Sequence, residues 1–287
     1  MKRRKSFSIS GLLKLTRFPN LLILGLTQYM AVIFLVPYPE AWPRGMLDIN
    51  LFLLTSGTVL IAAAGYIIND YYDVKIDYIN KPDRVVVGRV IRRRVVLASH
   101  ILFNLAGIAL GYYLDPKLGL LNFLAAVLLW AYSNQLKRLP FIGNFSIALL
   151  TGLSLVAVAM YYEQNVRLLL IYAVFAFSLN LIREIVKDME DVKGDARFGS
   201  RTLPIIWGLR PTKVLVYLLM AGFVFILMFM AYFLQNRTLN YFFIAMTVPV
   251  LVFIYLLYRA DTQRRFRNLS AYCKILMIAG IASMALF

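Results

Sequence analysis

The sequence predicts an all-α, polytopic membrane protein, and three observations support that prediction. Hydrophobic residues make up 61% of the 287-residue chain and charged residues only 16%, which lies well outside the usual range for a soluble domain. The apolar residues gather in runs long enough to cross a hydrocarbon core of about 30 Å. These runs lack the period-two alternation of barrel strands, so each is expected to form a helix that satisfies its own backbone hydrogen bonds.

Nine apolar runs of this length follow one another along the chain. They are expected at residues 20–36, 50–68, 95–114, 118–135, 141–162, 167–182, 214–234, 240–258 and 270–287. No separate soluble region, low-complexity tract or linker rich in Ser or Pro interrupts them. We therefore expect residues 1–287 to form a single domain, a bundle of nine transmembrane helices with cap loops on the cytoplasmic side.

The basic residues predict the orientation of this bundle. If the N-terminus lies inside, the interior connections hold 27 of the 31 Lys and Arg residues, and the other side keeps only Arg44, Lys117, Arg167 and Arg237. The positive-inside rule then predicts a multi-pass protein of the cell membrane with a cytoplasmic N-terminus and an external C-terminus. The same bias accounts for the net charge of +17, so no nucleic-acid partner is expected.

Acidic residues concentrate in two long interior connections, 69–94 and 183–213, which hold nine of the fourteen Asp and Glu residues. Long ordered loops often carry function. If the second span continues as a helix past Asn69, then Asp73 and Asp77 lie on one face with Asp70 one turn earlier.

The same spacing recurs at Asp188, Asp191 and Asp195, at the end of the sixth predicted span. Gly194 has a low helix propensity, so an interruption of the helix is the alternative in this second cluster. A single cluster of this kind is typical of a solvated loop, but two clusters at corresponding span ends favour a shared function.

Carboxylates stacked in this way repel one another and are costly near a bilayer, so they need partners. Mg²⁺ prefers oxygen ligands and is commonly shared between carboxylates, water and a substrate phosphate. Two facing clusters would hold a diphosphate through bridging metal ions, and we expect two Mg²⁺ ions. Cys273 is the only cysteine, which excludes a disulfide framework or a Cys-based metal site.

Basic side chains of the same two connections could reach the diphosphate oxygens, where Arg binds in bidentate fashion and Lys acts as a point charge. Alternatively, these side chains are ordinary positive charges at the membrane surface with no role in binding a substrate. The candidates are Lys81, Arg84, Arg183, Lys187 and Lys193.

At these residues the sequence resembles the UbiA superfamily of intramembrane prenyltransferases, and the resemblance covers nearly the whole chain. The family's first signature, NDxxDxxxD, matches NDYYDVKID from Asn69 to Asp77. Its second, DxxxD, matches DVKGD from Asp191 to Asp195. A Tyr and a Lys after the fourth span match Tyr132 and Lys137 in YSNQLK. The cap loop departs from the family pattern, because Val85 stands where a second proline is common.

The resemblance implies a UbiA-type fold, a polyprenyl diphosphate donor, an ionisation of its allylic carbon–oxygen bond and site residues with the following roles. Asn69, Asp73, Asp77, Asp191 and Asp195 would hold Mg²⁺ and through it the diphosphate, with Asp70 and Asp188 in or beside the same shell. Lys81, Arg84, Lys137 and Lys187 would neutralise the leaving group. Membrane lipid would surround the site.

The resemblance also suggests the acceptor. The stretches LTRFPNLL and REIVKDMEDVKGD resemble the branch that makes digeranylgeranylglyceryl phosphate. That branch implies a geranylgeranyl donor and a lipophilic prenylglycerol phosphate acceptor, whose phosphate or polar head would meet Arg17 or Asn20. An aromatic acceptor, as in quinone or haem pathways, is the alternative. An ion-binding transporter is a more remote one, because transporters usually place such residues near the bilayer midplane.

Overall fold

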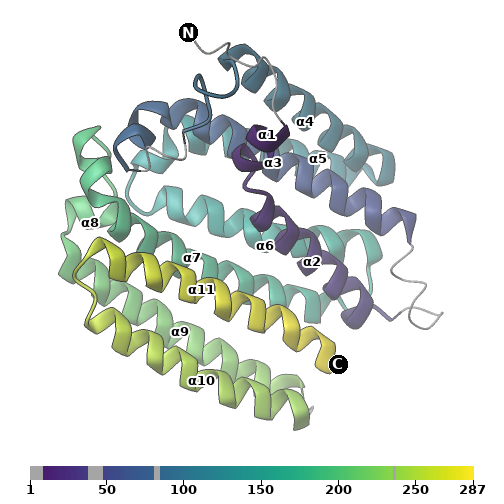
Figure 1. The fold of residues 1–287 in the computed structure, drawn as a ribbon. Coiled ribbons are helices and arrows are strands. Elements are labelled where there is room, and N and C mark those ends of the chain that lie inside the picture. The colour runs from purple at the N-terminus through teal and green to yellow at the C-terminus, as the bar shows by residue number, and fades with distance from the viewer. Residues whose placement is uncertain (1–8, 38–47, 81–84, 235–236) are drawn as a thin grey trace. The chain divides into compact units, whose positions relative to one another are not determined.

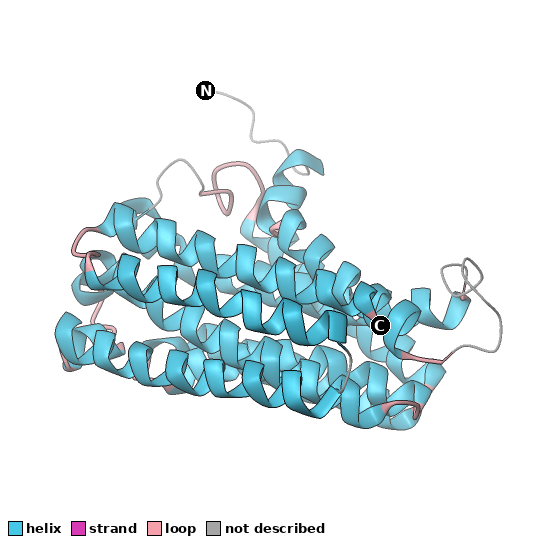
Figure 2. Ribbon diagram, turned by 90° about the horizontal axis from the view of Figure 1, so that it is seen from below, coloured by secondary structure: helices cyan, strands magenta, loops and turns pink. Residues whose placement is uncertain are grey.

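The structure is a computed structural model that describes residues 9–37, 48–80, 85–234 and 237–287. In these ranges all regular secondary structure is helical (Figure 2). In chain order the elements are α1 (Ile9–Leu15), α2 (Phe18–Leu35), α3 (Ile49–Asn80), α4 (Arg93–Leu114), α5 (Pro116–Asn134), η3 (Leu136–Arg138), α6 (Ile142–Tyr162), α7 (Val166–Arg197), α8 (Leu203–Ile206), α9 (Leu209–Leu234), α10 (Arg237–Tyr258), α11 (Gln263–Ser283) and η4 (Met284–Leu286).

Nine helices of the described chain are long and apolar enough to cross a membrane, which confirms the nine predicted spans. They are α2 to α7 and α9 to α11. The chain divides into two compact units. The first unit covers residues 1–29 and 38–137, and the second covers residues 30–37 and 138–287.

The first unit is built on close contact between α3 and its neighbours α4 and α5 (Figure 1). Gly57 and Gly107 allow the α3 and α4 backbones to approach closely, because a Cβ atom at Gly107 would lie 2.9 Å from the Gly57 carbonyl oxygen. Asn122 of α5 donates a hydrogen bond of 2.8 Å to the Gly107 carbonyl. Helices in membranes commonly associate through small residues and interhelical hydrogen bonds of this kind.

The second unit packs α6, α9 and α11 around α7 (Figure 1). Gly280 of α11 lies directly against the Phe175 ring of α7, where a Cβ atom would overlap the ring. At the same end, the Tyr172 hydroxyl and Ser283 Oγ are 2.9 Å apart in a buried hydrogen bond. These contacts fix the helix that carries the second acidic cluster.

Long loops were predicted at 69–94 and 183–213, but the first part of each is helical. The second and sixth spans continue into these segments as helices. α3 runs to Asn80 before the first proline in this region, and α7 passes through Gly194 to Arg197. α7 ends because Gly199 adopts a φ of +73° and the Ser200 N–H bonds to the Asp195 carbonyl at 3.0 Å, a typical helix stop. Both acidic clusters therefore lie on helices.

The last predicted span also begins earlier than expected. The basic stretch before residue 270 was expected to be a connection, but α11 starts at Gln263. Thr262 caps its N-terminus, with its side chain accepting a hydrogen bond from the Arg265 N–H at 3.4 Å. A capping residue thus starts the helix before the apolar run does.

The glycine contact in the first unit generates a stability prediction. Gly107→Ala should lower the stability by about 1–3 kcal/mol, because the new methyl group would press on backbone that cannot move aside. The measurement is thermal unfolding of the purified protein in detergent. Gly222→Ala in α9 is the matched control, since nothing lies within 4 Å of its added Cβ. An equal or smaller loss in Gly107→Ala than in Gly222→Ala would contradict this account.

Candidate active site

The first acidic cluster lies on the last turns of α3, within the first unit. Asp70, Asp73 and Asp77 are each partly buried and are separated by three and four residues along a continuous helix. This spacing places them on one face with Asn69 beside them. The conditional prediction that the helix passes Asn69 is confirmed.

Lys137 lies against this face. The chain leaves α5 through the short helix η3, which brings the Lys137 ammonium 2.6 Å from Asp73 Oδ1 and 3.4 Å from Asn69 Oδ1. The Lys137 and Asp73 side chains are only 10% and 15% exposed. A pair this buried needs its counter-charge, because a lone carboxylate would lose hydration without compensation. Tyr132 is half-buried near the end of α5.

Arg17 and Asn20 reach the same helix one turn earlier. The Arg17 guanidinium is 3.0 Å from Asp70 Oδ1 and stacks 4.9 Å from the centroid of the Tyr66 ring. Asn20 Nδ2 donates to the Tyr66 hydroxyl at 3.4 Å. Burial on its own would lower the pKa of Arg17, but the Asp70 carboxylate raises it overall, so the guanidinium stays charged.

Arg17 also has an uncommon backbone conformation. It occupies the turn between α1 and α2 with a φ of 51°, in the left-handed region that non-glycine residues rarely adopt. Such residues are enriched at functional sites, where the surrounding structure holds them in place. The structure therefore brings both first-span residues of the sequence prediction to the acidic face of α3.

The second acidic cluster lies on the last turns of α7, within the second unit. Asp188, Asp191 and Asp195 repeat the spacing of the first cluster on a helix that stays continuous through Gly194. Asn144 of α6 donates a hydrogen bond of 2.8 Å to Asp188 Oδ2. This contact orients one carboxylate of the cluster.

Asn144 was not among the predicted site residues. It is only 5% exposed, and its Oδ1 atom is buried without a hydrogen bond in the described structure. A polar amide inside an apolar run was the available signal, since intramembrane polar residues are costly and often functional. Its partner on α7, however, could not be found from the sequence.

Glu184 is a second residue that the sequence did not single out for the site. Its carboxylate is 7% exposed and contacts Arg183 at 2.5 Å and Lys187 at 3.2 Å. The two cations expected to approach a diphosphate therefore share an acidic partner on their own helix. Glu190 points elsewhere and pairs with Arg267 of α11 at 3.0 Å, which ties α7 to α11.

The remaining predicted cations are placed differently. Lys81 and Arg84 lie outside the described residues. Lys193 is exposed on α7 between Asp191 and Asp195.

The donor atoms of the two clusters are carboxylate and amide oxygens, which fit a hard cation such as Mg²⁺. Within the described ranges, no group of three or more His, Cys, Asp or Glu side chains is gathered closely enough to hold a metal ion. In each unit the carboxylates project from successive turns of one helix. Each cluster therefore offers donors to a metal ion and does not by itself form a closed metal site.

Comparisons with known proteins identify the family of the chain. The UbiA prenyltransferase family matches residues 29–280. A digeranylgeranylglyceryl phosphate synthase from Methanosphaera stadtmanae is 35% identical over 239 residues, which cover 82% of this chain and 86% of that protein.

Solved structures share the fold at lower identity. A structure that gives insights into digeranylgeranylglyceryl phosphate synthase in membranes has a TM-score of 0.73 and 22% identity, over 97% of this chain and 99% of the other. A UbiA homolog from Archaeoglobus fulgidus bound to DMAPP and Mg²⁺ has a TM-score of 0.67 and 16% identity, over 96% of this chain and 99% of the other. Because the family match covers residues 29–280, most of the chain, this protein belongs to the UbiA prenyltransferase family.

Proposed function

We propose that this prenyltransferase moves a geranylgeranyl group from its diphosphate to a prenylglycerol phosphate. The observation that carries the proposal is the likeness, along most of both chains, to a relative named digeranylgeranylglyceryl phosphate synthase. The two acidic clusters and Lys137 supply the charges that a diphosphate substrate needs. An aromatic acceptor and ion transport are the competing outcomes of the experiments below.

Mg²⁺ is the proposed cofactor, as two ions, because a UbiA homolog with this fold binds it together with DMAPP. Its ligands would come from Asn69, Asp70, Asp73, Asp77, Asp188, Asp191 and Asp195. When bound, the metal stabilises negative charge on the diphosphate as the leaving group departs. Because the family match extends over residues 29–280, we further propose that residues 1–287 act as one catalytic domain.

The cations beside the clusters would hold the same leaving group. Lys137, at 2.6 Å from Asp73, keeps that carboxylate in place and adds positive charge where the diphosphate binds. Arg183 and Lys187 would act from the second cluster while Glu184 fixes their position. Tyr132, Lys81 and Arg84 complete the proposed donor-binding set.

The transfer itself breaks one bond and forms another. The allylic carbon–oxygen bond breaks, and its electron pair leaves with the diphosphate. The acceptor hydroxyl oxygen then bonds to the allylic carbon and loses its proton to a basic oxygen at the site. Arg17 and Asn20 would bind the acceptor's phosphate or polar head, and the apolar bundle would keep water from the cation.

The test is a transfer assay with the purified protein in detergent, using radiolabelled geranylgeranyl diphosphate and Mg²⁺. Geranylgeranylglyceryl phosphate should be prenylated, and several phenolic acids should not. Asp73→Ala and Asp191→Ala should each reduce turnover about 100-fold or more, since a metal ligand contributes several kcal/mol to the transition state. Removing Mg²⁺ with EDTA should have the same effect.

Asp261→Ala is the matched control for the loss of a carboxylate. Its side chain is 75% exposed and pairs with Lys213, and neither residue belongs to an acidic cluster, so turnover should stay unchanged. Preferred transfer to a phenolic acid would replace the proposed acceptor with an aromatic one. If no donor–acceptor pair releases diphosphate, a transporter is favoured. Full activity in Asp73→Ala or Asp191→Ala would remove that residue from the site.

Asn144 is proposed to position Asp188 for the metal. Asn144→Ala should raise the Mg²⁺ concentration for half-maximal turnover about tenfold, as loss of a ligand's supporting contact commonly does, with little change at saturating Mg²⁺. Mn²⁺ binding followed by electron paramagnetic resonance should weaken in parallel. Asn122→Ala is the control, because it also removes a half-buried interhelical amide, but one that donates to the Gly107 backbone carbonyl and not to a carboxylate. Equal Mg²⁺ requirements in both variants would contradict the role.

The proposed orientation places the N-terminus in the cytoplasm and the C-terminus outside. Alkaline phosphatase fused after Phe287 should therefore be active, while green fluorescent protein at the same position should stay dark. Fusions after Gly208, between α8 and α9, should show the opposite pattern because the positive-inside rule puts that segment in the cytoplasm. The reversed pattern at both positions would overturn this orientation.

A further inference from the structure

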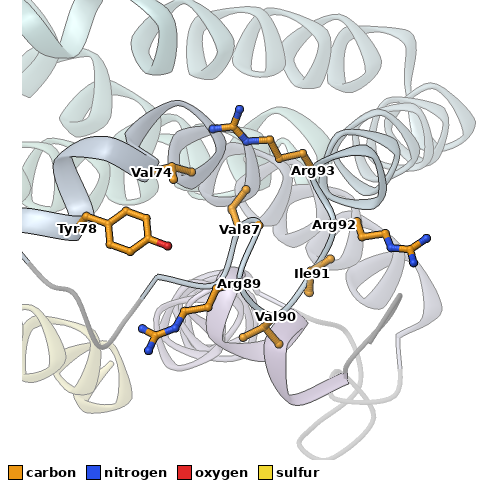
Figure 3. Close-up of a pocket in the computed structure, with 9 residues that line it drawn as sticks. Val74, Tyr78, Val87, Arg89, Val90, Ile91, Arg92 and Arg93 are labelled. Carbon is orange, nitrogen blue, oxygen red and sulfur yellow. The ribbon is translucent and has the colours of Figure 1, made fainter. Parts of the chain in front are cut away.

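A pocket of about 380 Å³ opens beside the end of α3, within the first unit (Figure 3). It is lined by Val74 and Tyr78 of α3, by Arg93 at the start of α4, and by the loop between these helices. The lining residues of the loop are Val87, Gly88, Arg89, Val90, Ile91 and Arg92. None of the described residues assigned to the metal or the diphosphate belongs to this lining.

The loop wall of the pocket is rigidly built. The Val86 carbonyl accepts hydrogen bonds from the N–H groups of Arg89, Val90 and Ile91, at 2.8 to 3.2 Å. Gly88 permits this tight turn with a φ of +78°. Beneath the turn, a buried cluster joins the loop to neighbouring helices through Leu15, Ile67, Val86, Val87, Ile91 and Val96. The pocket is therefore a preformed feature of the fold.

The lining combines positive charge with apolar surface. The described lining includes three arginines, one tyrosine and no acidic residue. In Figure 3 the side chains of Arg89 and Arg93 lie on either side of Tyr78 and Val74, whereas Arg92 points away. Arg93 is steadied by the Tyr71 ring, with 5.7 Å from its guanidinium carbon to the ring centroid. Guanidinium groups in this setting match the oxygens of a phosphate.

The position of the pocket along the helices indicates that the phosphate belongs to a lipid headgroup. The apolar run carried by α3 ends near Ile68, and the next apolar run begins near Val95 in α4. The lining runs between these two points, from Val74 to Arg93, so the pocket lies at the level where the apolar spans meet the polar boundary of the bilayer. Lipid headgroups occupy that level, and basic side chains there attract anionic ones.

We propose that this pocket binds the phosphate headgroup of an anionic lipid. Arg89 and Arg93 would contact the phosphate oxygens, and the first part of the apolar chain would lie along Val74, Val87 and Val90. The site is separate from the carboxylates, because Val74 and Tyr78 each follow an aspartate by one residue and so are turned about 100° around α3. Bulk membrane lipid and the proposed prenylglycerol phosphate acceptor share this chemistry.

Native mass spectrometry of the full-length protein in detergent tests the proposal, with EDTA present and no prenyl diphosphate. The probes are dioleoyl phosphatidic acid, dioleoylglycerol, which has the same chains without the phosphate, and geranylgeranylglyceryl phosphate. Phosphatidic acid should be retained and dioleoylglycerol should not. Arg89→Gln combined with Arg93→Gln should weaken phosphatidic acid binding about tenfold or more, as two charge-assisted contacts are lost.

Arg94→Gln combined with Arg264→Gln is the control, because it removes the same charge from exposed positions outside the lining. This pair should bind phosphatidic acid as the unchanged protein does. Equal binding by both pairs of variants, or equal retention of dioleoylglycerol and phosphatidic acid, would overturn the site. The result is independent of transfer, since Asp73→Ala should still bind the lipid even if no acceptor is prenylated.

Competition between the probes identifies the source of the phosphate. If geranylgeranylglyceryl phosphate displaces phosphatidic acid at an equal or lower concentration, the pocket is a docking site for the acceptor. If a large excess is needed, the pocket holds bulk lipid. Either outcome requires the phosphate site and supports it.

Discussion

A carboxylate cannot remain charged beside a hydrocarbon layer unless a cation or a hydrogen-bond donor stands next to it. Much of the structure around the two acidic clusters follows from this constraint. Asp70 has Arg17, Asp73 has Lys137, and Asp188 has the Asn144 amide. Glu184 and Glu190 are paired as well: Glu184 with Arg183 of its own helix, and Glu190 with Arg267 of α11, which ties the two helices together.

The same constraint shapes the helices that present these groups. The apolar parts of α3 and α7 are long enough to cross a membrane, and each helix continues without a break into the turns that carry its carboxylates. Close glycine contacts hold the spans in place, at Gly57 and Gly107 in the first unit and at Gly280 in the second. The charged groups are thereby held on rigid, closely packed helices. A site for ionising a diphosphate benefits from this arrangement, because fixed charges need not reorganise during the reaction.

Much of this could be predicted from the sequence. The apolar runs predicted all nine spans, because length and hydropathy decide what can cross a bilayer. The spacing of Asp70, Asp73 and Asp77 predicted a shared helical face, and the family resemblance indicated Lys137. The match of the UbiA prenyltransferase family to residues 29–280 confirmed the resemblance.

Other features lay beyond the sequence. The loops were expected to be longer because hydropathy marks where the membrane ends and does not mark where a helix ends; capping residues such as Thr262 and turn residues such as Gly199 decide that. Asn144 and Glu184 escaped notice because their importance comes from neighbours on the folded helices. The rigid turn around Val86, which forms one wall of the pocket, depends on three backbone hydrogen bonds that could not be predicted from the residue types.

The unbroken course of α3 from Ile49 to Asn80 has a consequence for how this chain can vary. Each residue of an α-helix adds about 1.5 Å of rise and 100° of rotation. Inserting or deleting one residue anywhere between the glycine contact at Gly57 and the aspartates would rotate the carboxylates by about 100° around the helix axis. The number of residues between the glycine contact and the aspartates is therefore constrained, because it sets the direction in which the carboxylates point.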